Sequence, residues 1–308
     1  MEKLFIKAAD GYKLGAMYGR PVGTSIGTVV ISSATAVKKE FYISYARYLI
    51  QNGYNVLLFD YRGVGESAPD ELKNCNAYMH EWGTLDMNAA LHFLVYEKGL
   101  SDIIWVGHSI GAQLTGFLTS TASIKKVIAV NAAVGYWGYF PFPRKIAIWA
   151  LWYVISPVLV KLYGYGTMKI VGWGENLPKN VLMEWRKWCM SKTYYADFLK
   201  TRFRTDKFYD FKVPLVAVYT SDDFIANDKT ASLMLNFFPN APTAIIKLEV
   251  GKYTRHKAGH VGIFRKKFKN DLWVVLTEII EDDSLTHKHL AGIQSGYVKA
   301  QQADKWPA

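Results

Sequence analysis

The sequence has few cysteines and few charged residues. Its 308 residues include only two cysteines, Cys75 and Cys189, which excludes a disulfide-stabilised scaffold. Without a CxxC or His/Cys cluster, a structural zinc site is not expected either. Only 20% of the residues are charged and half are hydrophobic, which excludes a disordered chain. Residues 1–10 contain no apolar core of signal-peptide length, so we expect a cytoplasmic protein.

Acidic residues are also scarce, and the resulting basic excess is concentrated in one segment. The chain has 26 Asp and Glu against 37 Lys and Arg, a formal net charge of +11. Residues 134–205 carry 11 basic and 3 acidic residues and hold six of the ten tryptophans, whereas 1–133 and 206–308 are close to neutral. A nucleic-acid-binding protein more often spreads a basic stripe across its main fold. We therefore expect no nucleic-acid partner, and connect the basic charge with an anionic substrate or a membrane surface.

The basic segment contains a long uncharged run at 146–160, flanked by Lys145 and Lys161. It is too short for a confident transmembrane helix, and Pro157 interrupts it. We favour a buried helix that covers a pocket. The alternative is an interfacial helix, with Trp and Tyr side chains at the depth of lipid headgroups.

Outside this segment, short apolar runs alternate with segments of helical length. Such alternation predicts an α/β fold with a mostly parallel twisted sheet and helices on both faces. The expected strands cover 27–32, 55–59, 103–106, 126–130, 214–219 and 244–249. An antiparallel hairpin is expected within the first 20 residues. Helices are expected at 39–52, 85–98, 110–120, 228–238 and 264–280. The predicted domains are a core of 1–133 and 206–280, a helical cap of 134–205, and a C-terminal tail of 281–308.

A candidate nucleophile lies in the run Gly107-His108-Ser109-Ile110-Gly111, which fits G-x-S-x-G. A predicted strand precedes this run and a predicted helix follows it, which is the context that gives the pattern meaning. A sharp turn there would expose the Ser109 hydroxyl and aim the Ile110 N–H at a developing oxyanion. The alternative is a helix N-terminus with a capping serine.

A serine nucleophile needs a base and a carboxylate that orients the base. His260, among small residues before the last predicted helix, is the preferred base over His256 and His108. Asp222 and Asp223 follow the predicted strand at 214–219, and we favour Asp223 while leaving Asp222 open. The order Ser, Asp, His along the chain is the one that this type of nucleophile turn uses.

A second oxyanion donor is expected in the loop after the strand at 27–32. The backbone N–H of Thr35 is the candidate, with the neighbouring Ala34 left open, and an ordinary loop without a catalytic donor is the alternative. The glycine-rich run at 63–68 imitates a dinucleotide-binding loop, but Pro69 follows at once and no helix opens there. We therefore expect neither a cofactor nor a metal.

With these motifs in place, the chain resembles the α/β-hydrolase superfamily and, more closely, a group of predicted bacterial α/β-hydrolases. The matching stretches are 33–42, Gly135-Tyr136-Trp137, 162–188, Ser221-Asp222-Asp223 and Gly259-His260-Val261-Gly262-Ile263-Phe264. The resemblance implies a canopy of helices inserted after the sixth strand, and a triad of Ser109, one Asp of the 222/223 pair, and His260. It departs at residue 36, where Ala stands in place of the expected Gly.

These observations predict a serine hydrolase, carboxylesterase- or lipase-like, that cleaves an ester or related acyl bond through an acyl-enzyme. The aromatic cap suits a small-molecule substrate with an acyl chain or aromatic ring, and its basic charge suits an anionic group or peripheral membrane contact. An amidase, peptidase or thioesterase would use the same triad. A non-catalytic binding protein of the same fold is the remaining alternative.

Overall fold

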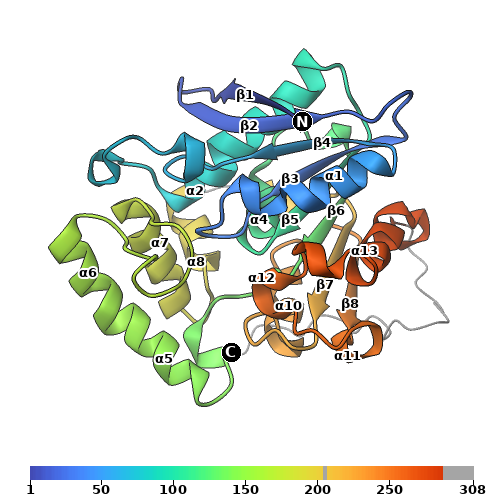
Figure 1. The fold of residues 1–308 in the computed structure, drawn as a ribbon. Coiled ribbons are helices and arrows are strands. Elements are labelled where there is room, and N and C mark those ends of the chain that lie inside the picture. The colour runs from blue at the N-terminus through green and yellow to red at the C-terminus, as the bar shows by residue number, and fades with distance from the viewer. Residues whose placement is uncertain (204–206, 287–308) are drawn as a thin grey trace.

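The computed structural model describes residues 1–203 and 207–286, which contain an eight-stranded sheet (Figure 1). The strands lie in the order β1-β2-β4-β3-β5-β6-β7-β8. The first two form an antiparallel hairpin, β2 pairs antiparallel with β4, and the remaining neighbours are parallel. The strands are β1 (Glu2–Lys7), β2 (Lys13–Gly19), β3 (Gly27–Ser32), β4 (Tyr54–Phe59), β5 (Ile103–His108), β6 (Ile124–Val130), β7 (Leu215–Thr220) and β8 (Thr243–Leu248).

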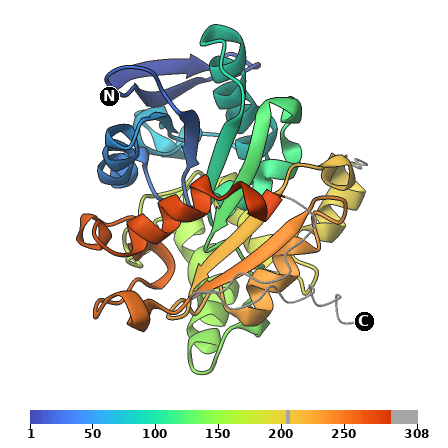
Figure 2. The same ribbon diagram turned by 90° about the vertical axis from the view of Figure 1, so that its right-hand side faces the viewer.

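Helices cover both faces of the sheet, so the central strands are buried on both sides and read as continuous apolar runs. Alternate side chains of each strand enter different cores. On β3, for example, Val29 and Ile31 pack with α1 (Ile43–Gln51) and α13 (Leu272–Glu281). Val30 packs on the opposite face, in the core that includes a helical run over 79–97. Figure 2 shows α13 lying across the parallel strands.

That run over 79–97 consists of α2 (Met79–Glu81), α3 (Asn88–His92) and two π-helical stretches. The other helices of the core are short: α4 (Ile110–Gln113), α10 (Asp228–Leu235), α11 (Val250–Tyr253) and α12 (Gly259–Gly262).

A helical insert connects β6 to β7. It comprises α5 (Arg144–Ala150), α6 (Ser156–Tyr163), α7 (Lys179–Met190), α8 (Ala196–Phe198) and α9 (Lys207–Asp210), with π-helical turns at Leu151–Ile155 and Leu199–Phe203. Figure 1 places α5 to α8 together on one side of the molecule. One link to the core is a hydrogen-bonded pair, in which the His80 ring and backbone N–H contact the Glu184 carboxylate of α7.

The α/β class and the mostly parallel sheet predicted from the sequence are confirmed. The division into core, cap and tail stays a prediction, and the tail beyond residue 286 lies outside the described residues. Three predicted helices are wrong in extent. The one expected at 85–98 belongs to the helical run that already begins at Met79. The one expected at 264–280 begins only at Leu272, and the one expected at 110–120 is α4 followed by a 3-10 turn, Leu114–Phe117.

The expectation of a buried helix at 146–160 is also wrong in part. Arg144–Tyr163 is continuously helical, and only 28% of its most apolar stretch of 18 residues is buried inside the protein. Pro157 does not break it because the π-helical turn Leu151–Ile155 precedes the proline. In a π-helical turn the N–H of residue 157 would donate a hydrogen bond to the carbonyl of Trp152, five residues earlier, but proline has no N–H to donate. The Arg186 side chain of α7 donates to that carbonyl instead.

The loop between β3 and α1 is anchored by a buried lysine. The Lys39 side chain is 0% exposed, and its ammonium contacts Asp60 and Glu66 at 2.7 Å each and Glu40 at 2.9 Å. Its backbone N–H also donates to Asp60. Burial alone would lower the pKa of Lys39, but hydrogen bonds to Asp60 and Glu66 raise it above its ordinary value.

Replacing Lys39 with Met is expected to destabilise the fold strongly, because it leaves the buried Asp60 carboxylate without its cation. Breaking a buried pair in this way costs about 3–5 kcal/mol. Lys73→Met is the control, since Lys73 pairs with Glu71 on the surface, where an ion pair contributes about 0–1 kcal/mol. Urea unfolding followed by circular dichroism measures both. Equal losses in the two variants would contradict the anchoring role.

Candidate active site

The nucleophile candidate Ser109 lies in a sharp turn between β5 and α4. Its backbone has φ +53° and ψ −116°, a conformation that non-glycine residues rarely adopt. A Cβ atom at Gly107 would lie 2.5 Å from Ala112, and one at Gly111 would lie 2.4 Å from the Ser32 carbonyl oxygen. Both glycines are therefore required by close backbone packing, and the turn holds the serine hydroxyl at the edge of a cavity.

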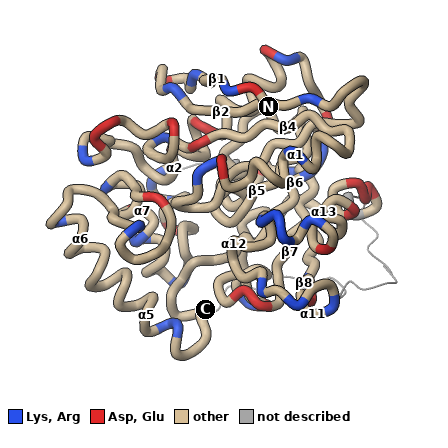
Figure 3. The backbone as a smooth tube through the Cα atoms, viewed as in Figure 1, with Lys and Arg blue, Asp and Glu red and all other residues tan. Residues whose placement is uncertain are grey.

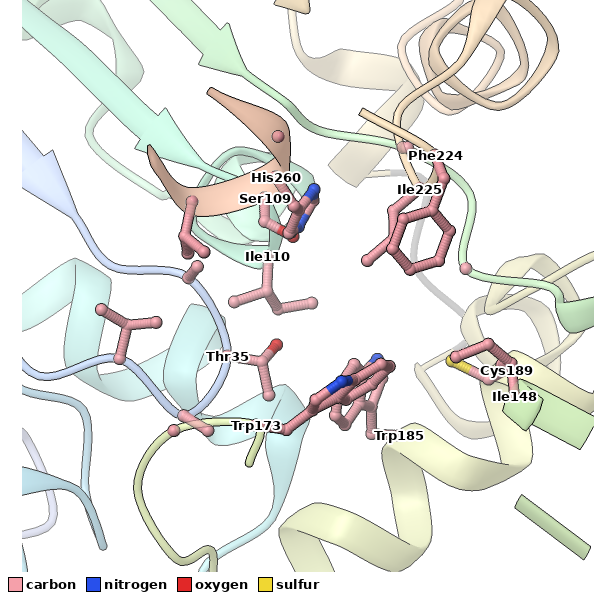
Figure 4. Close-up of a pocket in the computed structure, with 18 of the residues that line it drawn as sticks. Thr35, Ser109, Ile110, Ile148, Trp173, Trp185, Cys189, Phe224, Ile225 and His260 are labelled. Atoms are coloured by element: carbon pink, nitrogen blue, oxygen red, sulfur yellow. The ribbon is translucent and has the colours of Figure 1, made fainter. Parts of the chain in front are cut away.

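His260 and Asp223 complete a chain of hydrogen bonds with this serine. The His260 Nε2 atom lies 3.0 Å from Ser109 Oγ, and its Nδ1 atom lies 2.7 Å from Asp223 Oδ2. The Asp223 side chain is fully buried and the imidazole is 18% exposed. A carboxylate only accepts, so Nδ1 carries the proton and Nε2 is free to accept from the serine. Figure 4 shows Ser109 and His260 side by side at the cavity.

The two neighbouring aspartates have different partners. Asp222 accepts from the backbone N–H groups of Ala258 and Gly259 at 2.8 and 3.0 Å, and so fixes the loop that carries the histidine. Asp223 contacts the imidazole itself. The structure thus places Asp223, the residue favoured from the sequence, against the imidazole, and places Asp222 against the backbone that precedes it.

Both oxyanion candidates border the same cavity as the serine. The N–H of Ala34 donates to the Tyr42 hydroxyl at 3.0 Å, which removes the alternative donor left open by the sequence. Within 1–203 and 207–286 the N–H groups of Thr35 and Ile110 have no hydrogen-bond partner, and both residues line the cavity with Ser109. Ala36 has φ +60°, which explains why glycine was expected there.

A buried hydrogen-bond chain joins the Thr35 loop to the backbone of His260. The Tyr42 hydroxyl, which accepts from Ala34, lies 2.7 Å from His108 Nδ1. His108 Nε2 lies 2.8 Å from the carbonyl oxygen of His260 and must donate to it. Asn131 also donates to that carbonyl, at 2.8 Å. The sequence alone predicted neither role, because the turn directs His108 away from the nucleophile and no motif marks Asn131.

This series of hydrogen bonds requires the imidazole ring of His108 to stay neutral. Nδ1 must accept from Tyr42 while Nε2 donates, and only one tautomer of the neutral ring does both. Burial, together with the nearby His260, lowers the pKa of His108 to about 3. The side chain is 0% exposed, so the neutral form is maintained well below neutral pH.

The cavity in front of the serine has a volume of about 670 Å³, a size that suits small-molecule ligands. Three tryptophans of the insert, Trp152, Trp173 and Trp185, line it. Phe224 and Ile225, which follow the aspartate pair, line another part (Figure 4). The sequence located the aromatic segment but could not show which aromatic rings face the serine.

One loop of the insert packs directly on the oxyanion loop. The N–H of Glu175 donates to the carbonyl of Ala36 at 2.7 Å. Gly174, at φ +98°, approaches so closely that a Cβ atom there would lie 2.2 Å from the same carbonyl oxygen.

Among the described residues no group of three His, Cys, Asp or Glu side chains is placed to bind a metal ion.

Comparison with known proteins gives one family and many related folds. A profile of the family described as "Serine aminopeptidase, S33" matches residues 23–258. Similar solved structures include an esterase from Exiguobacterium antarcticum (14% identity, TM-score 0.56, 91% of this chain and 100% of that chain). A bromoperoxidase from Bacillus anthracis is also similar, with 18% identity and a TM-score of 0.55 over 91% of this chain and 100% of that chain. So is an esterase from Pyrococcus furiosus, with 17% identity and a TM-score of 0.55 over 91% of this chain and 89% of that chain. At these identities the likeness shows the fold alone. No curated protein matches the sequence.

Because His108 is buried in its neutral form, we expect its contribution to the free energy of unfolding to be lost in acid. The unfolded chain binds a proton at His108 below a pH of about 6.5 whereas the folded chain does so only near pH 3, so the free energy of unfolding falls as the pH drops through this window. Between about pH 7.5 and about pH 5 the His108 contribution lost is about 2 kcal/mol. His108→Gln, which offers a neutral donor and acceptor, should lack this loss in urea unfolding. An identical pH dependence in the two proteins would refute it.

Proposed function

The chain belongs to the serine aminopeptidase S33 family, which lies within the α/β-hydrolase superfamily that the sequence motifs indicated, and we propose that it is a serine hydrolase that cleaves an ester or related acyl bond. The observation that carries this proposal is the hydrogen-bonded arrangement of Ser109, His260 and Asp223. Family membership supports hydrolysis, and the geometry supports serine as the nucleophile.

The proposed reaction uses each group in a distinct role. Ser109 Oγ attacks the acyl carbonyl while His260 Nε2 takes its proton, and the same imidazolium then protonates the leaving alcohol. Asp223 holds Nδ1 and stabilises the positive ring. His260 Nε2 then takes a proton from a water molecule as this water attacks the acyl-enzyme carbonyl, and returns the proton to Ser109 Oγ as the bond to the acyl group breaks and the acid leaves.

The tetrahedral intermediate carries a negative oxygen that needs donors. The N–H groups of Thr35 and Ile110, which have no partner among the described residues, are the proposed donors, since both residues line the cavity with the serine. The hydrogen bond of Ala34 to Tyr42 and the contact of Gly174 with Ala36 would hold the Thr35 loop in place before the substrate arrives. Such preorganised donors stabilise the transition state without moving during the reaction.

The cavity supports a substrate with an apolar acyl chain or ring. Its wall includes Phe140, Ile148 and Cys189 as well as the three tryptophans. Apolar walls of this kind bind substrates by removing hydrocarbon from water.

The charges that line the cavity favour an ester over an aminopeptidase substrate. An aminopeptidase must bind a free ammonium group, for which a carboxylate is the natural partner. Glu175 is the only Asp or Glu among the described lining residues, and it contacts Lys169 at 2.8 Å and Lys38 at 3.7 Å. Its charge is already compensated, which leaves a substrate ammonium without a carboxylate.

Ser109→Ala is expected to keep the fold and to lower the turnover of short p-nitrophenyl esters by at least about 10⁴-fold, because the attacking oxygen is gone. Release of p-nitrophenol is followed by absorbance, and circular dichroism checks the fold. Turnover at the wild-type rate in this variant would sink the proposal.

The aspartate pair provides a matched comparison. Asp223→Asn should reduce kcat by about 10⁴-fold, since an amide cannot hold His260 in the required tautomer and charge state. Asp222→Asn keeps an oxygen that can accept from the Ala258–Gly259 backbone, so its loss of kcat should be much smaller. The same ester assay measures both. A larger loss in Asp222→Asn would reverse the assignment.

A further inference from the structure

The helix Arg144–Tyr163 has two apolar faces, only one of which is covered by the protein. Its inner face packs inward through the buried side chains of Ile148, Leu151, Trp152 and Val160. A second set of apolar side chains is between 39% and 71% exposed, and we define this set as the outer face: Ile146, Trp149, Tyr153, Val158 and Leu162. A helix on the surface of a soluble protein normally turns polar side chains to water on this side.

The length and composition of this helix would suffice to cross a membrane, but its packing does not suit a span. Trp152 is 1% exposed, lines the cavity, and accepts a hydrogen bond from Arg186 through its carbonyl. Ile148, one turn earlier, lines the same cavity. Moving the helix into the bilayer core would empty one wall of the cavity. The packing allows the helix to lie along an interface instead, with its inner face still in the protein.

The charge around the helix selects the kind of interface. Residues 103–174 contain no Asp or Glu and six Lys or Arg, and the residues next to the uncharged run are Lys145 and Lys161. In Figure 3 basic residues lie near the ends of α5 and α6, with uncharged chain between them. A second copy of this chain would bring the same acid-free segment against itself, with like charges opposed. An anionic lipid surface complements both the apolar face and the basic ends.

We propose that the outer face docks the protein on a bilayer that contains anionic lipid. The apolar side chains enter the boundary between headgroups and acyl chains, where Trp149 and Tyr153 suit the headgroup depth. Lys145 and Lys161 contact lipid phosphates. Since Ile148 and Trp152 line the cavity from the opposite side of this helix, docking places the cavity wall next to the lipid. Delivery of a lipid ester to Ser109 is a consequence that rests on the proposed function, whereas docking itself does not.

Flotation with lipid vesicles tests the docking. The wild-type protein should float with phosphatidylcholine vesicles that contain about 30% phosphatidylglycerol, and less with pure phosphatidylcholine or at high salt. The triple variant Ile146→Ser, Trp149→Ser, Leu162→Ser should bind about tenfold more weakly or worse. The matched control replaces three exposed apolar residues elsewhere, Phe5→Ser, Val22→Ser and Tyr96→Ser, and should bind like the wild type.

Further variants separate the contribution of the basic residues, and the effect of catalysis, from that of the apolar outer face. Lys145→Glu with Lys161→Glu should weaken binding to the anionic vesicles about tenfold or more while leaving binding to pure phosphatidylcholine unchanged. Ser109→Ala should float like the wild type, so that loss of catalysis and loss of docking are distinguishable. Thermal unfolding by circular dichroism checks that every variant folds.

Two results would overturn the proposal. One is equal vesicle binding by the wild type and the outer-face triple variant, or no binding by either. The other is a wild-type dimer that the triple variant abolishes, seen by light scattering in a protein that does not float, since a second copy would then be the occupant of this face.

Discussion

The backbone turn at Ser109 is the constraint on which the site depends. Its positive φ aims the side chain out of the sheet, and only glycine fits at positions 107 and 111 beside it. Because parallel strands end at the same edge, the turn after β5 meets the loops after β3, β7 and β8. Asp223 and His260 come from two of these loops, and Thr35 comes from the third. The strain at one residue is maintained by the packing of the whole sheet.

Side chains that never face the cavity hold these loops in register. Tyr42 and His108 link the Thr35 loop to the His260 carbonyl, and Asp222 holds the N–H groups just before His260. In this arrangement the proposed oxyanion donor and the proposed base share one buried support. A catalytic geometry of this kind needs positions fixed to a fraction of an ångström, which isolated loops do not provide.

The sequence predicted the features that depend on local pattern. Apolar runs predicted the parallel strands, and G-x-S-x-G predicted the turn. The order along the chain pointed to Ser109, His260 and one Asp of the 222/223 pair, and the structure brings Asp223 together with the other two. It did not predict the roles of His108 and Asn131, since their partners, the Tyr42 hydroxyl and the His260 carbonyl, are distant in sequence. It also expected burial at 146–160, because hydrophobicity alone does not show whether an apolar side chain meets protein or water.

The proposed function rests on the hydroxyl of Ser109 as the nucleophile. Labelling with a fluorophosphonate probe, followed by mass spectrometry of the digested protein, identifies the reactive serine. We expect a phosphonyl adduct on the peptide that contains Ser109, formed by the wild type and reduced to background in Asp223→Asn. An adduct on a different serine, or ester hydrolysis by a protein that the probe does not label, would contradict it.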